Sequence, residues 1–113
     1  ESESIRRYNK TIKTIHRYIK QHLQEDISLT TLAEQVYLNP VYLSRIYKQL
    51  TGQKLSNYIT RERIERAKTL LAEPQYKINE IGYQVGYESP AHFSRAFKKT
   101  VGLTPAEYRE SLL

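Results

Sequence analysis

The chain of 113 residues contains no cysteine and no methionine. Without cysteine it can form no disulfide bond, no thiolate metal site and no cysteine nucleophile, and it suits a reducing compartment. The remaining conceivable metal ligands are Asp, Glu and the histidines His16, His22 and His92. We expect neither a metal nor another cofactor. Because the chain starts at Glu1 and lacks Met, we expect it to be a piece of a longer protein whose upstream part is missing.

Long apolar runs are absent too. No segment approaches the roughly 20 apolar residues that a membrane helix needs, and the N-terminus lacks the apolar core of a signal peptide. Gly and Pro occur only four times each, and no low-complexity stretch or flexible linker is present. We therefore expect a cytoplasmic protein with no membrane partner, built as one domain or as a tandem of two small cores.

Acidic residues are outnumbered: 18 Lys and Arg stand against 12 Asp and Glu, which gives a net charge of +6. This balance favours a polyanionic partner such as nucleic acid. Charge alone also fits a basic domain that is merely soluble, so the position of the cations matters more than their number.

The chain contains an internal repeat. The segment 29–36 returns as 78–85, offset by 49 residues, and Tyr42–Lys48 returns as His92–Lys98, offset by 50. The extra residue therefore falls at the junction between the two halves of the repeat, which predicts a turn there. Two short helices around a turn, present twice, are what a chain needs to grip a duplex at two places.

The apolar spacing is helical almost throughout, and no alternating strand pattern is present. Ser28, Asn39, Ser89 and Thr104 each stand where a helix N-cap is expected, and Pro follows at three of these positions. We predict an all-α fold of seven helices. It comprises two helix-turn-helix subdomains, about 5–53 and 76–112, joined by a long connecting helix over about 55–72.

The second helix of each repeat, about 40–51 and 90–101, has two distinct faces. At 100° per residue, the residues predicted to face inward are Leu43, Ile46, Tyr47 and Leu50 in the first copy and Phe93, Ala96, Phe97 and Thr100 in the second. The residues predicted to face outward are Val41, Ser44, Arg45 and Lys48, and then Ala91, Ser94, Arg95 and Lys98, with His92 beside them.

These outward faces carry the chemistry of DNA recognition. The guanidinium groups of Arg45 and Arg95 match the O6 and N7 acceptors of guanine in the major groove. Lysines further along each helix, Lys48, Lys98 and Lys99, can reach phosphates. Val41 and Ala91 can meet the methyl group of thymine.

The run from Ile78 to Arg109 resembles the signature of the AraC/XylS family of bacterial transcription regulators. It combines a Gly-aromatic turn at Gly86-Tyr87, the helix Phe93-Ser-Arg-Ala-Phe97-Lys98, and the ending Gly102-Leu-Thr-Pro-Ala-Glu-Tyr-Arg109 in one register. The family fold that this implies is two helix-turn-helix units joined by a long helix, and Arg63-Ile-x-x-Ala67 is similar to that connector. The resemblance covers nearly the whole chain from His16 onward.

The resemblance implies a function and a set of contacts. A family member binds double-stranded promoter DNA, and RNA polymerase and an upstream sensor or receiver domain are implied as further partners. The positions that correspond to the family's base readers are Val41, Ser44 and Arg45, then Pro90, Ala91, His92, Ser94 and Arg95. Since Pro90 and Ala91 lack hydrogen-bonding side-chain groups, the second unit is expected to add more affinity than discrimination. The run from Asn39 to Arg45 also resembles the branch of the family that is attached to receiver domains.

One departure from the family pattern is Gly82, where members usually carry Ala. A glycine at this helical position is expected to cost about 1 kcal/mol of helix stability. The roles of Arg63 and Arg109, which lie outside the second helix of each repeat, are also open. Arg63 could reach a phosphate, but its place beside Ile64 and Ala67 favours an internal ion pair. Arg109 has the same two possibilities.

Two other functional classes are compatible with parts of the sequence. A helical protein-interaction module would use the basic faces to bind an acidic partner, and it would tolerate Lys in place of Arg45 and Arg95. An enzyme is the other class, but no nucleophile-base pair and no Gly-rich phosphate loop stands out. We therefore expect a DNA-binding regulator without catalytic residues.

Overall fold

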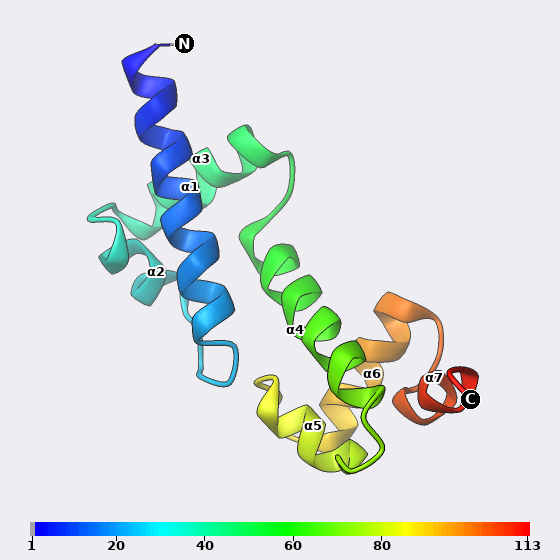
Figure 1. The fold of residues 1–113 in the computed structure, drawn as a ribbon. Helices are drawn as coiled ribbons and strands as arrows, with labels where there is room; N and C mark the ends of the chain where they lie inside the picture. Colours follow the sequence, from blue (N-terminus) through cyan, green and yellow to red (C-terminus); the bar gives the residue numbers. More distant parts are fainter. Residues whose placement is uncertain (1) are drawn as a thin grey trace. The chain divides into compact units, whose positions relative to one another are not determined.

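The computed structural model describes residues 2–113, which are all-helical with no strand among them (Figure 1). The seven helices of this described part are α1 (Glu3–Gln21), α2 (Leu29–Gln35), α3 (Pro40–Thr51), α4 (Leu55–Leu71), α5 (Ile78–Gln84), α6 (Pro90–Val101) and α7 (Pro105–Ser111). These helices confirm the predicted all-α fold class. The physical reason is the apolar period of 3.6 residues, which over these lengths is typical of helices.

The chain forms two compact units. Unit 1 comprises the residues up to His22 and Asp26–Tyr58, and unit 2 comprises Leu23–Glu25 and Ile59–Leu113. Unit 1 thus contains α1, α2 and α3, and unit 2 contains α5, α6 and α7, while α4 begins in the first and continues in the second. Within unit 1, α2 and α3 pack against each other, and α5 and α6 do so within unit 2. Each pair is a helix-turn-helix.

The two helix-turn-helix pairs differ by one residue in the turn. Four residues separate Gln35 from Pro40, and five separate Gln84 from Pro90. The change in repeat offset from 49 to 50 therefore lies in the turn, as predicted from the sequence.

The predicted N-caps are present. Ser28 accepts the backbone N–H of Thr31 at 3.0 Å, and Asn39 accepts the N–H of Val41 at 2.9 Å. In unit 2, Ser89 accepts the N–H of His92 at 3.1 Å. These bonds satisfy N–H groups that no helical carbonyl can reach, so Asn39 and Ser89 have a structural use, as expected from capping preference.

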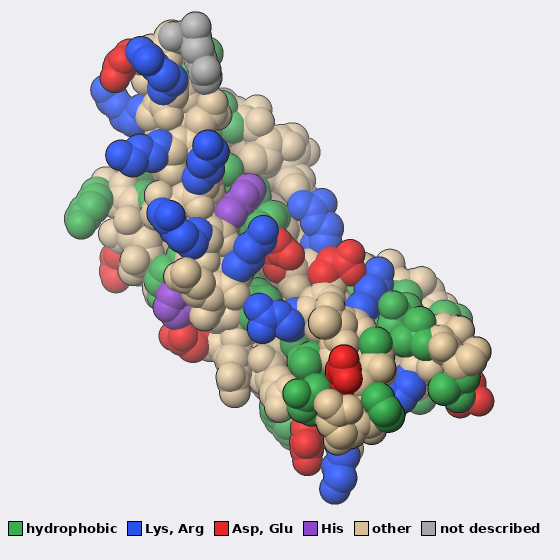
Figure 2. Space-filling view, viewed as in Figure 1, with side chains coloured by type: hydrophobic (Ala, Val, Ile, Leu, Met, Phe, Trp, Pro, Cys, Tyr) green, Lys and Arg blue, Asp and Glu red, His purple; other side chains and the backbone are tan. Residues whose placement is uncertain are grey.

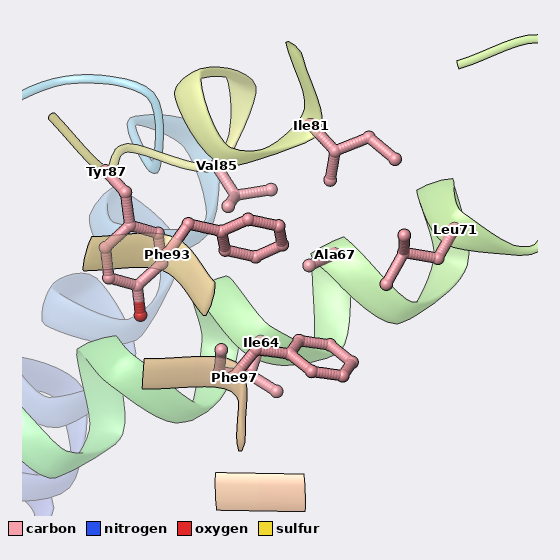
Figure 3. Close-up of a cluster of buried hydrophobic side chains, with 8 residues drawn as sticks. All are labelled: Ile64, Ala67, Leu71, Ile81, Val85, Tyr87, Phe93 and Phe97. Atoms are coloured by element: carbon pink, nitrogen blue, oxygen red, sulfur yellow. The ribbon is translucent and has the colours of Figure 1, made fainter. Parts of the chain in front are cut away.

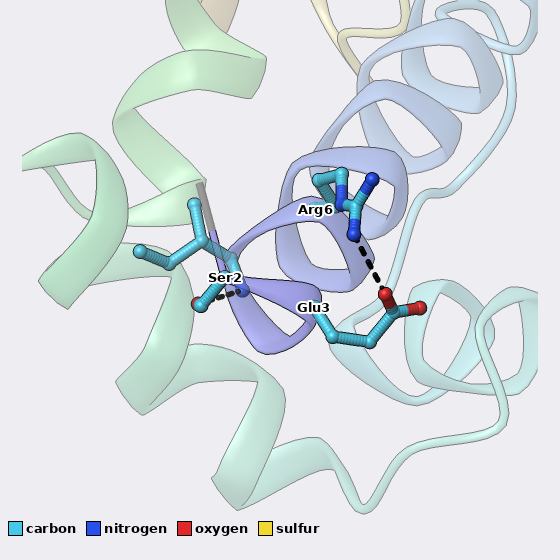
Figure 4. Close-up of polar contacts among 4 residues, drawn as sticks. Ser2, Glu3 and Arg6 are labelled. Carbon is cyan, nitrogen blue, oxygen red and sulfur yellow. Dashed lines mark hydrogen bonds and ion pairs between the residues drawn. The ribbon is translucent and has the colours of Figure 1, made fainter.

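The other two capped helix starts lie near the ends of the chain. At the start of α1, Ser2 accepts the N–H of Ile5, and Arg6 pairs with Glu3 at 2.8 Å (Figure 4). Thr104 and Glu107 form the predicted capping box of α7. The hydrogen bond from the Thr104 backbone N–H lowers the pKa of the Glu107 carboxyl, because it stabilises the charged form.

The core of unit 1 combines aliphatic side chains with a polar aromatic group. Ile15 and Ile19 of α1 are fully buried, as are Leu32 and Leu43. His16 stacks on the ring of Tyr58 with centroids 4.0 Å apart, and its Nε2 lies 2.8 Å from the buried hydroxyl of Tyr47. The imidazole thereby satisfies a hydroxyl that would otherwise be costly to bury.

The core of unit 2 is built on two phenylalanines of α6 (Figure 3). The rings of Phe93 and Phe97 are 5.8 Å apart in an edge-on arrangement, and Phe97 meets Tyr108 of α7 at 5.5 Å. The buried side chains of this cluster are Ile64, Ala67, Leu71, Ile81, Val85, Tyr87, Phe93 and Phe97. It joins α4, α5 and α6 into one packed unit.

Gly82 has a packing use that the sequence did not indicate. A Cβ atom at this position would lie 2.9 Å from Cδ2 of Phe93 and 3.0 Å from its Cβ and Cγ atoms. The corresponding positions of unit 1 hold Ala33 and Leu43, both buried. Unit 2 therefore combines a larger side chain on α6 with a smaller residue on α5.

Two residues predicted to face inward are exposed. Leu50 is 42% exposed, and Thr100 at the same place in α6 is exposed as well. The helices that cover α3 and α6, namely α2 and α5, have seven residues each, whereas α3 and α6 have twelve. The shorter helix extends only about 10 Å, so the last turn of the longer one lies beyond its cover.

The two cations left open by the sequence, Arg63 and Arg109, both turn inward within unit 2. Arg63 donates to the backbone carbonyl of Glu25 at 3.1 Å, and its guanidinium lies 5.7 Å from the ring centre of Tyr87.

Arg109 of α7 donates to three carbonyl oxygens, those of Leu71, Glu73 and Tyr76, at 2.9, 3.2 and 2.8 Å. It thereby satisfies carbonyl groups at the end of α4 and in the following loop, and it adds a second hydrogen bond to the Glu73 carbonyl, which also accepts the backbone N–H of Tyr76 at 3.2 Å. Its guanidinium therefore has a structural use.

Candidate nucleic-acid interface

The residues of the turns set where α3 and α6 begin. These two helices, each the second of its helix-turn-helix pair, are called the recognition helices below. Tyr37 adopts a left-handed conformation at φ 57° in the first turn, and Gly86 adopts one at φ 102° in the second. Gly86 is required there, because a Cβ atom would overlap the carbonyl oxygen of Leu23. Tyr37 carries the strain of a left-handed non-glycine residue, and its side chain is 95% exposed.

The outward face of α3 lies as predicted. Val41 is 66% exposed, and Ser44, Arg45 and Lys48 are exposed as well. Because the opposite face of the helix holds the buried Leu43 and Tyr47, packing fixes which way these four side chains point.

A contact from α1 holds the start of α3. The hydroxyl groups of Tyr8 and Tyr42 are 2.9 Å apart. This hydrogen bond raises the pKa of the Tyr42 hydroxyl above its ordinary value, and desolvation adds to the effect. Tyr42 therefore remains neutral near pH 7, and the hydrogen bond between the two hydroxyl groups helps to orient the first turn of α3.

A shallow hollow of about 600 Å³, the α2/α3 hollow, opens on this face of unit 1. It is lined by Leu29 of α2 and by Val41, Ser44, Arg45, Lys48 and Gln49 of α3. It therefore gathers all four predicted contact residues of α3.

Leu29 and Gln49 are lining residues that the sequence analysis did not assign to the site. Leu29 lies on the same face of α2 as the buried Leu32 and Ala33, yet it is 37% exposed. It is the first residue of α2, and helical side chains lean toward the N-terminus, so its side chain extends past the end of the covered face.

The outward face of α6 is similar but less complete. Ala91, His92, Arg95, Lys98 and Lys99 are exposed, whereas Ser94 is half-buried. The imidazole of His92 meets the ring of Tyr87 edge-on at 5.1 Å, so its orientation is partly fixed by the core. Pro90 is half-buried as the first residue of the helix.

Positive charge is concentrated on unit 1. It carries nine Lys and Arg residues against four Asp and Glu, whereas unit 2 carries nine against eight. Figure 2 shows Lys and Arg side chains spread along α1. Nearly all of the net charge of the chain therefore belongs to the first unit.

Among residues 2–113, no three His, Cys, Asp or Glu side chains are grouped so that they could hold a metal ion. None of the described helices is long and apolar enough to cross a membrane.

Residues 32–111 match the model of a family described as a helix-turn-helix domain. Among curated proteins, the chain is similar to the regulatory protein PocR of Salmonella typhimurium, with 30% identity over 105 residues that cover 93% of this chain and 35% of PocR. The chain thus spans about a third of the length of that relative.

Two solved structures share the fold. The C-terminal domain of AraT, a response regulator from Geobacillus stearothermophilus, superposes with a TM-score of 0.85 at 37% identity, covering 89% of this chain and 84% of that one. The DNA-binding domain of the global transcriptional factor AdpA, in complex with a target DNA, superposes with a TM-score of 0.80 at 27% identity, covering 86% and 87%.

Proposed function

This chain belongs to the AraC-type family of helix-turn-helix, DNA-binding transcription regulators, and we propose that it binds promoter DNA in a sequence-specific manner through α3 and α6. The family is one of regulators and is not a known class of enzymes. Each recognition helix enters the major groove, and the two occupy successive segments of one duplex.

The observation that carries the proposal is the matching outward chemistry of the two helices. α3 presents Arg45 and Lys48 at the positions where α6 presents Arg95 and Lys98, and all four are exposed. Each helix begins at a Pro behind a side-chain cap and ends before a left-handed glycine, so the two present these cations in the same helical frame. A duplex offers guanine edges to the arginines and phosphates to the lysines.

We assign roles by chemistry. Base contacts are made by Val41, Ser44 and Arg45 in unit 1, and by Ala91, His92, Ser94 and Arg95 in unit 2. Phosphate contacts are made by Lys48, Lys98 and Lys99. The half-buried Ser94 and the absence of a polar side chain at Ala91 leave Arg95 and His92 as the main base readers of the second unit.

The charge distribution supports unequal contributions of the two units. Phosphate neutralisation supplies most of the sequence-independent affinity of such domains. Since unit 1 holds nearly all of the excess positive charge, we infer that it supplies the larger share of the affinity as well as the stronger base readout.

Further partners follow from the family and from the length of the relatives. The chain spans 35% of PocR, and the AraT domain comes from a response regulator. We propose that an upstream sensor or receiver domain controls this domain in the cytoplasm, and that RNA polymerase is the partner through which bound protein affects transcription.

The test is selection of bound duplexes from a random DNA pool, followed by titration of the recovered site. We expect one enriched site with two half-sites about one helical turn apart, 10–10.5 base pairs. If the bound duplexes have the same sequence distribution as the starting pool, sequence-specific binding is contradicted.

Variants of α3 then separate base readout from simple charge attraction. Arg45→Lys keeps the charge but loses the paired donors, so it should weaken the selected site by about 1–3 kcal/mol and leave random DNA nearly unchanged. Lys48→Ala should weaken both equally. Lys54→Ala is the matched control, because Lys54 is exposed and does not line the α2/α3 hollow. An Arg45→Lys variant that binds the selected site as well as the parent would contradict base readout by Arg45.

A further inference from the structure

The α2/α3 hollow contains more apolar surface than phosphate or guanine contacts require. Leu29 and Val41 are both aliphatic, line the hollow together, and remain 37% and 66% exposed. Arg45 and Lys48 line the same hollow. Two exposed hydrocarbon side chains therefore lie beside two cationic side chains in the same hollow.

The major groove offers one apolar group to such a surface. Among the four base pairs, only A·T and T·A present a methyl group there, on C5 of thymine. Burial of hydrocarbon between Leu29, Val41 and that methyl group is favourable, since apolar surface leaves water on both sides. A guanine or cytosine edge at the same place would bring polar groups against the two aliphatic side chains without a partner.

We propose that Leu29 of α2, together with Val41 of α3, selects a thymine by enclosing its C5-methyl group in the α2/α3 hollow. This inference rests on the proposed function and adds a residue from α2 to the base-reading surface. It also gives the position of the thymine. Val41 and Arg45 are one helical turn apart, about 6 Å along the axis, or about two base-pair steps of 3.4 Å.

The thymine therefore lies within about two base pairs of the guanine bound by Arg45. That guanine can be located without changing the protein. Replacement of each guanine of the selected site by 7-deazaguanine, which lacks the N7 acceptor, should weaken binding of the parent at the Arg45 position. It should have little effect in an Arg45→Ala variant, which has no donor for N7.

The test is replacement of each thymine near that guanine by deoxyuridine, which lacks only the methyl group. One such replacement should weaken the parent about fourfold, the factor that corresponds to one buried carbon at about 0.8 kcal/mol. In the Leu29→Ala variant the same replacement should change the affinity less than twofold, because the wall of the hollow is gone.

The matched control is Leu50→Ala. Leu50 has a similar exposed fraction, 42%, and does not line the hollow, so this variant should keep the fourfold effect. If Leu29→Ala is unstable in a thermal melt, Leu29→Thr replaces it. We expect this second variant also to lose the preference for thymine over deoxyuridine.

The outcomes separate this inference from the proposed function. A selected site whose binding is insensitive to every deoxyuridine replacement overturns the inference and leaves DNA binding intact. A fourfold effect that persists in both Leu29 variants also overturns it, since the methyl contact would not involve α2. Absence of any selected site overturns the proposed function itself.

Discussion

The close approach at Gly82 gives a stability prediction whose sign depends on the structure. In an exposed helix, Gly→Ala stabilises by about 1 kcal/mol because alanine is the better helix former. At Gly82 the added methyl group would stand 2.9–3.0 Å from three atoms of Phe93. Two of these are Cβ and Cγ, which cannot move without a shift of the ring or of α6, so overpacking should cost about 1–3 kcal/mol. We expect Gly82→Ala to destabilise unit 2 by up to about 2 kcal/mol.

A double-mutant cycle isolates the cause. Phe93→Leu removes part of the ring and should cost about 1–2 kcal/mol through lost burial. The double variant recreates the Ala33 and Leu43 combination of unit 1, so we expect its cost to be smaller than the sum of the two single costs by about 1 kcal/mol. Ala33→Gly in unit 1 is the complementary control, and it should destabilise by about 1 kcal/mol.

The assay is urea unfolding followed by far-UV circular dichroism, with amide hydrogen exchange to assign the loss to unit 2. A stabilising Gly82→Ala, or strictly additive costs in the cycle, would refute the packing argument. Either result would mean that Gly82 is merely a poor helix residue, as its sequence position alone suggests.

Three further stability predictions follow from single residues. Arg109→Lys should cost about 2 kcal/mol in urea unfolding. The guanidinium reaches the three carbonyls from two nitrogens, Nε and Nη2, whereas all donors of an ammonium group lie on one nitrogen. Unchanged stability would show that these bonds are replaceable by water. Tyr87→Phe should be neutral or stabilising by about 1 kcal/mol, since the buried hydroxyl has no hydrogen-bond partner among the described residues and burial raises its pKa; a clear loss in the same assay would reveal a bonded hydroxyl. Tyr37→Gly should raise the melting temperature of unit 1 by a few degrees. The variant relieves about 1–2 kcal/mol of left-handed strain, which exceeds the entropic cost of glycine, about 0.5–1 kcal/mol. A lower melting temperature would argue that the exposed tyrosine ring is stabilising.

Local signals were enough to predict the helices. The apolar period, the capping residues and the glycines at 52 and 102 act within a few positions of themselves, and the helix ends follow from them. The outward direction of Arg45 and Lys48 was predictable for the same reason, because it depends only on the period of one helix whose other face is apolar.

What the sequence did not indicate depends on neighbouring elements. Leu50 shares the apolar face of α3, but its burial depends on the length of α2. The guanidinium of Arg109 reaches carbonyls more than thirty residues earlier in the chain, and no sequence pattern encodes such a contact. Leu29 joins the candidate site only because the start of α2 lies beside α3.

The most direct test of the central claim is a titration of the chain with its selected duplex at several salt concentrations. If α3 and α6 bind DNA with about six phosphate contacts, the logarithm of the affinity should fall with the logarithm of the salt concentration at a slope near −5. Arg45→Lys should leave that slope unchanged while weakening binding to the selected site. An affinity that does not respond to salt, or that is the same for selected and random duplexes, would contradict the account.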